Sequence, residues 1–285
     1  MWGGRGQRSR IFGRYPVLSD NLNRCQLPLF FLFSLIISWA VWVPQAVVKM
    51  SNPAAAAATG SPMNVLAVWG PGLSAIILSL LIAGKAGLRW LFRPVLIWRV
   101  GAFWYFLVLL YPAALKLAAY GIDMVLGRSY ELVFLPIRLY FSPQQAIVMV
   151  PAVFIAAVPN ALGEELGWRG FALPRLQEKL NALGASIILG LFWGIWHLPM
   201  WVSTTGTIGM HELAMMLNIV GLAILFTWVY NRTSGSVLLV WLFHFSITIT
   251  GYSLSKIPTA TDEIMSWFVI VLVVLMAGPR RLWRV

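Results

Sequence analysis

Charged residues are scarce in this sequence of 285 residues. Asp, Glu, Lys and Arg together make up 11% of the chain, whereas soluble domains carry about 25%. Hydrophobic residues make up 60%, and the mean hydropathy is +0.80. This composition excludes an ordinary soluble domain and indicates an integral membrane protein.

Acidic residues and cysteine are also scarce. Nine Asp and Glu stand against 21 Lys and Arg, which gives a formal net charge of +12. The basic residues stand in short loops between apolar segments, so membrane topology explains them better than nucleic-acid binding does. Cys25 is the only cysteine, so no intrachain disulfide forms and no redox compartment follows.

Long apolar runs, by contrast, are abundant and predict an all-α polytopic membrane protein with about eight transmembrane helices. Each run approaches the roughly 20 residues that cross a bilayer. The first run lacks a small-residue cleavage site, so it predicts a retained helix and not a signal peptide. The last run has only fifteen residues and must borrow from its flanks. The runs cover residues 27–48, 63–84, 100–126, 143 to about 164, 183–202, 213–230, 235–254 and 264–278.

The distribution of positive charge predicts the orientation. With the N-terminus in the cytoplasm, sixteen Lys and Arg fall on the inner segments and four on the outer loops. This bias follows the positive-inside rule and predicts that both termini are cytoplasmic. Lys116 and Asp123 lie inside the third run, seven residues apart on one helical face. They are expected either to snorkel to the outer interface or to have a functional role.

Four parts of the chain are predicted from this pattern. The second, third and fourth parts hold the membrane helices, and the third contains the candidate catalytic core. The parts are a basic cytoplasmic segment at 1–26, helices one to three with their loops at 27–142, a four-helix core at 143–255, and the last helix with a basic tail at 256–285.

Two adjacent carboxylates and an arginine, Glu164, Glu165 and Arg169, follow an apolar run without charge. An ionised group near the bilayer centre costs from about 3 to more than 10 kcal/mol, which favours a functional role. The alternative is that the pair lies in water just beyond the helix end. Glu165 and Arg169 are four residues apart and are expected to pair on one face. Glu164 is rotated by about 100° and is left as a candidate general base.

Two of the three histidines, His197 and His244, lie inside the fifth and seventh runs, whereas His211 is expected at the surface. In one mechanism, Glu164 and a histidine activate water while the other histidine stabilises an oxyanion. In the other, His197, His244 and Glu164 hold a divalent metal such as zinc. No His-Glu-x-x-His motif is present, so the sequence leaves the cofactor open between a metal and none.

A serine mechanism is disfavoured, because no G-x-S-x-G motif is present and Ser246 points to a different face from His244. Depth sets a further condition on the site. The carboxylates and both imidazoles meet only if the fourth helix continues past Arg169, to about residue 173 or 174. The fifth helix must then begin before residue 183 or be tilted.

These motifs, in this order and spacing, resemble the CAAX prenyl protease and bacteriocin-processing (CPBP, Abi) family of glutamate-type intramembrane endopeptidases. The resemblance covers about residues 145–255. It implies that Glu164 activates water, that Glu165 and Arg169 support it, and that the family's two helix histidines are His197 and His244. It also implies a cavity open toward the cytoplasm; the use of a metal is contested within the family. The matching residues are Glu164-Glu165-x-x-x-Arg169, Trp193-x-x-x-His197, Tyr230-Asn231-Arg232-Thr233-x-Gly235-Ser236 and His244.

Two residues depart from the family pattern. Trp193 stands where the family usually has Phe, and it is interpreted as a packing residue, as is Trp196. Thr248 stands where the family usually has Asn, which offers both a donor and an acceptor. A threonine hydroxyl is shorter and can bond back to its own helix.

The leading functional hypothesis is an intramembrane endopeptidase that acts on a membrane-associated or lipidated protein or peptide. The first alternative is a scaffold, immunity or regulatory protein of the same fold with little or no hydrolysis. The second is a proton-coupled transporter, which the absence of an inverted repeat disfavours. The expected partners are membrane lipid and substrate, not nucleic acid. The short loops indicate a prokaryotic cell membrane. Substrate identity, prenylation and oligomeric state do not follow from the sequence.

Overall fold

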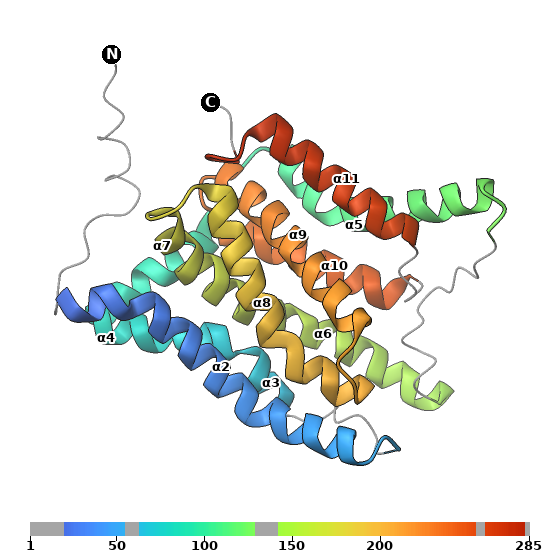
Figure 1. The fold of residues 1–285 in the computed structure, drawn as a ribbon. Helices are drawn as coiled ribbons and strands as arrows, with labels where there is room; N and C mark the ends of the chain where they lie inside the picture. Colours follow the sequence, from blue (N-terminus) through green and yellow to red (C-terminus); the bar gives the residue numbers. More distant parts are fainter. Residues whose placement is uncertain (1–19, 55–62, 129–141, 255–259, 283–285) are drawn as a thin grey trace.

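The computed structural model describes residues 20–54, 63–128, 142–254 and 260–282 (Figure 1). Within these ranges the regular structure is helical and contains no strand, which confirms the all-α prediction. The elements are α2 (Asp20–Ser51), α3 (Met63–Val68), α4 (Gly70–Phe92), η2 (Arg93–Leu96), α5 (Ala102–Val125), α6 (Pro143–Gly167), η4 (Trp168–Ala172), α7 (Leu173–Gln177), α8 (Ala182–Thr205), α9 (Met210–Arg232), α10 (Val237–Ser253) and α11 (Ala260–Ala277).

In the described part of the chain, seven helical segments are long and apolar enough to cross a membrane. The remaining predicted run, the seventh at residues 235–254, forms α10, which is apolar but has only 17 residues. α6 continues through the π-helical turn η4 into α7, so one span runs over Pro143–Gln177. This confirms that the fourth helix extends past Arg169. α8 begins at Ala182, one residue before the predicted start.

The helices form a closed ring of neighbours. Their main contacts follow the order α2, α8, α9, α11, α5, α10, α6, α4 and back to α2, with further contacts between α9 and α10 (Figure 1). η4 contacts α4, α6 and α10. Because η4 carries Arg169, this arrangement puts the arginine among helices that the sequence separates widely.

Two glycines set the position of α6 against α4. A Cβ atom at Gly163 would lie 2.7 Å from the Trp69 ring, and one at Gly167 would lie 2.5 Å from Pro71. Small residues four apart allow two membrane helices to approach closely. Glu164 and Glu165 lie between these glycines, so the α4–α6 contact fixes the rotation of the helix that carries both carboxylates.

Side-chain caps begin three of the helices that build the site. Ser142 and Gln145 form a capping box at the start of α6, and Asn181 accepts a bond from the Gly184 amide at 2.7 Å to start α8. Ser236 caps α10 and also donates to the Ile97 carbonyl at 2.6 Å. The start of α10 is therefore fixed to the segment that follows η2.

The second predicted span differs from the structure at its end. The sequence places a basic loop after residue 84, but α4 kinks at Ala83 and Gly84 and then continues to Phe92. Gly84 has a φ of 55°, a conformation that glycine adopts without steric cost. Lys85 and Arg89 therefore lie on the helix and not in a loop.

Lys116 and Asp123 do not both snorkel to an interface. Asp123 is fully buried and accepts hydrogen bonds from Thr261 on α11 and from Arg128. Lys116 forms an ion pair with Asp262, also on α11, at 3.2 Å. The two residues connect α5 to α11, and the snorkelling interpretation is wrong for Asp123.

Candidate active site

Glu165 is the centre of a buried ionic network. The Arg169 Nη1 lies 3.0 Å from Glu165, and neither side chain is exposed at all, which confirms the predicted pair. His244 Nδ1 lies 2.8 Å from Glu165 Oε1. An ionised carboxylate only accepts, so Nδ1 carries the proton of this bond and Nε2 remains as the other ring nitrogen. The link from Glu165 to His244 was not predicted.

Arg169 is held between two aromatic rings. Its guanidinium carbon lies 4.6 Å from the Trp193 ring centroid and 4.7 Å from that of Phe226. Nε and Nη2 have no hydrogen-bond partner within the described residues. The faces of the two rings stabilise the cation electrostatically in place of those bonds. Arg169 thus joins η4 to α6, α8 and α9.

Glu164 has a different set of contacts from its neighbour. Its Oε2 accepts a hydrogen bond from Trp193 Nε1 at 2.7 Å. Glu164 keeps 7% of its surface exposed, whereas Glu165 keeps none. Trp193 is therefore more than the packing residue that the sequence suggested. The signal was present, because tryptophan, unlike phenylalanine, has an N–H to donate.

His197 is fixed by its own helix and by a second tryptophan. Its Nδ1 lies 2.8 Å from the carbonyl oxygen of Trp193, so this nitrogen donates and Nε2 is an acceptor in the neutral ring. The ring stacks on Trp201 with centroids 5.3 Å apart and an interplanar angle of 10°. The hydrogen bond and the stacking together hold the imidazole in one orientation.

The Trp193 indole is the point where the three predicted site residues meet. Its centroid lies 5.9 Å from that of His197 and 5.6 Å from that of His244, and its N–H bonds Glu164. The side chains come from α6, α8 and α10. The structure therefore brings Glu164, His197 and His244 to one indole, from helices that are far apart in the sequence.

The two α10 hydroxyls considered in the sequence analysis, Thr248 and Ser246, lie outside this cluster of contacts. Thr248 donates to the His244 carbonyl at 3.1 Å, the bond back to its own helix that a threonine hydroxyl can form. Ser246 donates to the Val108 carbonyl and so connects α10 to α5. His211, as expected, is exposed at the start of α9.

The predicted metal ligands do not assemble into a metal site. Over the ranges that the structure describes, no three His, Cys, Asp or Glu side chains lie close enough together to hold an ion. Glu164 is bonded to Trp193, and His244 directs Nδ1 to Glu165.

Comparison with known proteins agrees with the position of this site. Residues 145–250 match a family model described as type II CAAX prenyl endopeptidase Rce1-like. CAAX prenyl protease 2 of Methanococcus maripaludis is 34% identical over 107 residues, which is 35% of this chain and 39% of that protein. The similarity to this relative therefore spans well under half of either chain. The model match extends from α6 to α10 and includes every predicted site residue, and the family resemblance seen in the motifs is confirmed there.

Proposed function

We propose, from the Rce1-like CAAX prenyl endopeptidase domain of residues 145–250, that the protein is an intramembrane endopeptidase. Its substrate would be a membrane-associated or lipidated protein or peptide. The observation that carries the proposal is the contrast between the two carboxylates. Glu165 is neutralised by Arg169 and bonded to His244, whereas Glu164 accepts one neutral N–H bond and retains some exposed surface.

Glu164 serves as the general base in this proposal. Its Oε2 is bonded to Trp193, so Oε1 takes a proton from water while the water oxygen bonds to the peptide carbonyl carbon. The carbonyl oxygen becomes an oxyanion. Glu164 then returns the proton to the peptide nitrogen, the C–N bond breaks, and an acid and an amine are released.

The hydrogen bonds of the two histidines suggest different roles. Neutral His197 has an acceptor at Nε2, which suits it to orient the attacking water together with Glu164. His244 has a carboxylate behind Nδ1, which stabilises a positive charge on the ring. His244 Nε2–H then donates to the oxyanion. Glu165 and Arg169 position His244 and do not contact the substrate.

The membrane position follows from the same proposal. The helices that carry the site are apolar, and the distribution of positive charge in the sequence predicts that both termini are cytoplasmic. The site is therefore proposed to open toward the cytoplasmic side of a prokaryotic cell membrane.

One observation favours a second candidate, a scaffold that binds the same class of peptide without hydrolysis. Thr248 bonds back to the His244 carbonyl, and it lacks the amide that the family usually has at this position. If that amide is required for the oxyanion, the chain binds substrate but turns it over very slowly.

A cleavage assay on the full chain in liposomes distinguishes the two candidates. Two internally quenched peptides are used, one with a prenylated C-terminal cysteine and one without. We expect the wild type to cleave the prenylated peptide and Glu164→Gln to be slower by about 10²- to 10⁴-fold, the range for a lost general base. Glu178→Gln, which removes an exposed carboxylate after α7, is the control and should keep the wild-type rate.

Equal rates for the wild type and Glu164→Gln would overturn the peptidase proposal. Saturable binding of the prenylated peptide without cleavage would favour the scaffold.

A further inference from the structure

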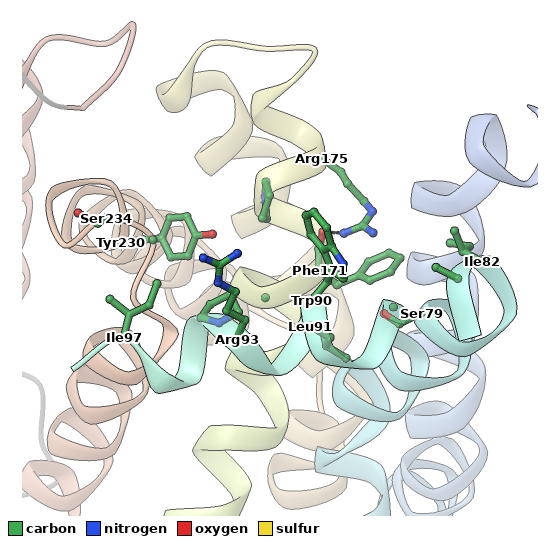
Figure 2. Close-up of a pocket in the computed structure, with 16 residues that line it drawn as sticks. Ser79, Ile82, Trp90, Leu91, Arg93, Ile97, Phe171, Arg175, Tyr230 and Ser234 are labelled. Carbon is green, nitrogen blue, oxygen red and sulfur yellow. Dashed lines mark hydrogen bonds between the residues drawn. The ribbon is translucent and has the colours of Figure 1, made fainter. Parts of the chain in front are cut away.

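A cavity of about 280 Å³ lies beside the segment that follows Arg169 (Figure 2). Residues of α4, η2, η4, α7 and the α9–α10 connection line it. Gly170 and Phe171 directly follow Arg169 and form part of its wall, but none of the predicted site residues does. The other wall residues that carry the argument are Trp90, Arg93, Arg175 and Tyr230.

The kink of α4 makes room for this cavity. Ile82 and Gly87, which line the cavity, lie on either side of Gly84 in the sequence. Gly84 has a positive φ, and the helix changes direction there. A Cβ atom at Gly87 would lie 2.0 Å from the Ser79 carbonyl oxygen, so the two arms of the helix meet at van der Waals contact. The shape of the cavity is thus fixed by the backbone.

The lining is basic and contains no carboxylate. Arg175 is buried, donates to Gln26 and to the Phe171 carbonyl at 2.8 Å each, and lies 3.7 Å from the Phe171 ring centroid. Arg93 is exposed, and its backbone N–H bonds the Arg89 carbonyl at the end of α4. Figure 2 shows the Arg93 guanidinium and the Tyr230 hydroxyl directed toward one another.

Arg93, which lines the cavity, lies near the end of a membrane span. The α4–η2 segment is apolar from Gly70 to Leu96. Phe92 and Leu96, which flank Arg93, are 41% and 74% exposed. Basic and aromatic side chains beside exposed apolar ones are typical of the membrane interface, and this end is assigned to the cytoplasmic side by the charge bias.

We propose that this cavity binds the phosphate of an anionic phospholipid from the cytoplasmic leaflet. Basic pockets between transmembrane helices on this side suit acidic headgroups. Arg93 and Arg175 supply charge and hydrogen-bond donors to the phosphate oxygens, and the exposed Phe92 and Leu96 contact the acyl chains. A soluble anion would gain the first interaction but not the second. This inference does not depend on the peptidase proposal.

A bound lipid would add contacts between separate elements of the fold. The headgroup would connect η2 to α7 and to the α9–α10 connection, where Ser234 and Gly235 line the cavity. A ligand that binds only the folded state raises the unfolding midpoint by mass action. Lipid binding is therefore measurable without any cleavage assay.

The test is a lipid titration of the purified full chain in detergent, followed by its thermal unfolding midpoint. We expect phosphatidylglycerol to raise the midpoint and phosphatidylcholine to have little effect. Arg93→Gln should weaken the apparent affinity for phosphatidylglycerol at least about fivefold, the loss expected for one interfacial cation. Arg93→Lys should retain most of the affinity.

The matched control is Arg89→Gln. Arg89 is exposed on the same helix, one turn earlier, and does not line the cavity. The Arg89→Gln variant loses one positive charge, as Arg93→Gln does, but outside the cavity. Its affinity for phosphatidylglycerol should therefore equal that of the wild type. Equal affinities in Arg89→Gln and Arg93→Gln would overturn the proposal, as would an equal response to phosphatidylcholine. Inorganic phosphate that gives the full midpoint shift alone would assign the cavity to a soluble anion instead.

Discussion

Two polar clusters connect helices of this protein, and they are built differently. The cluster between α5 and α11 pairs each cation with one acid. Lys116 lies 3.2 Å from Asp262, and Arg128 lies 3.2 Å from Asp123, which also accepts from Thr261. Equal numbers of opposite charges connect two neighbouring helices, so this cluster is fully explained as a structural contact.

The cluster around Glu165 is not balanced in this way. The cluster contains two carboxylates but only one guanidinium, that of Arg169. Only Glu165 lies within ion-pair distance of it. Glu164 is left with a neutral indole donor, and two imidazoles lie against the same indole. Burying an acid without a cationic partner is expensive, and proteins that retain such an acid in a cleft generally use it. The excess of carboxylates over cations, more than the burial of the side chains, indicates that this cluster is the reactive one.

The largest effect is expected from Glu165→Gln. This change leaves Arg169 buried without its counter-ion, so the free energy of unfolding should fall by about 3–5 kcal/mol. It also replaces the carboxylate behind His244 Nδ1 with a neutral amide, which no longer stabilises a positive charge on the ring, so kcat should fall at least about 100-fold. Chemical unfolding in detergent and peptide cleavage measure the two effects separately.

A double variant shows whether the two effects of this change have different causes. Glu165→Gln combined with Arg169→Met removes the unpaired cation and should recover most of the stability. His244 still lacks its carboxylate, so kcat should remain low. Recovery of activity together with stability would mean that Glu165 matters only as the partner of Arg169.

The next effect concerns Glu164 and is tested by Trp193→Phe. Phenylalanine keeps an aromatic face for Arg169 but cannot donate to Glu164 Oε2. A hydrogen bond to a charged group contributes about 1.5–3 kcal/mol, so kcat should fall about 10- to 100-fold while KM stays nearly constant.

Trp196→Phe is the matched control for this prediction. Trp196 lies three residues along α8 and donates to Ser38 Oγ at 2.6 Å and not to a carboxylate; its ring packs edge-on against His197, a contact that phenylalanine can also make. Its loss should lower stability by about 1 kcal/mol and leave kcat unchanged. Equal effects of both substitutions on kcat would show that Trp193 acts through general packing and does not position Glu164.

The parts of this picture that the sequence predicts are those set within one helix. Eight apolar runs predict the helices, and the spacing of Glu165 and Arg169 predicts their pair, because both depend on local periodicity. The bonds from Glu165 to His244 and from Trp193 to Glu164 cross between helices. They depend on rotations fixed by the contacts of Gly163 and Gly167 with α4, which spacing alone does not reveal.

The kink at Gly84 shows a second limit. A glycine at the end of an apolar run, followed by lysine and arginine, is typical of a helix terminus. Here the helix resumes as far as Phe92, because Gly84 only redirects it and the residues beyond still form apolar contacts such as those of buried Leu91. The cavity at Arg93 depends on that kink. Because the sequence pattern does not predict the kink, it does not predict the cavity.

The smallest effect is expected from Asp123→Asn, the same change of acid to amide as Glu165→Gln but in the balanced cluster. The amide oxygen can still accept from Thr261, and the lost cation, Arg128, is half exposed and can turn to water. Stability should therefore fall by only about 1–2 kcal/mol, with kcat within about twofold of the wild type. The same unfolding and cleavage measurements apply. A drop in kcat as large as that of Glu165→Gln would mean that the two clusters are coupled, and that charge balance does not separate a structural contact from a reactive one in this fold.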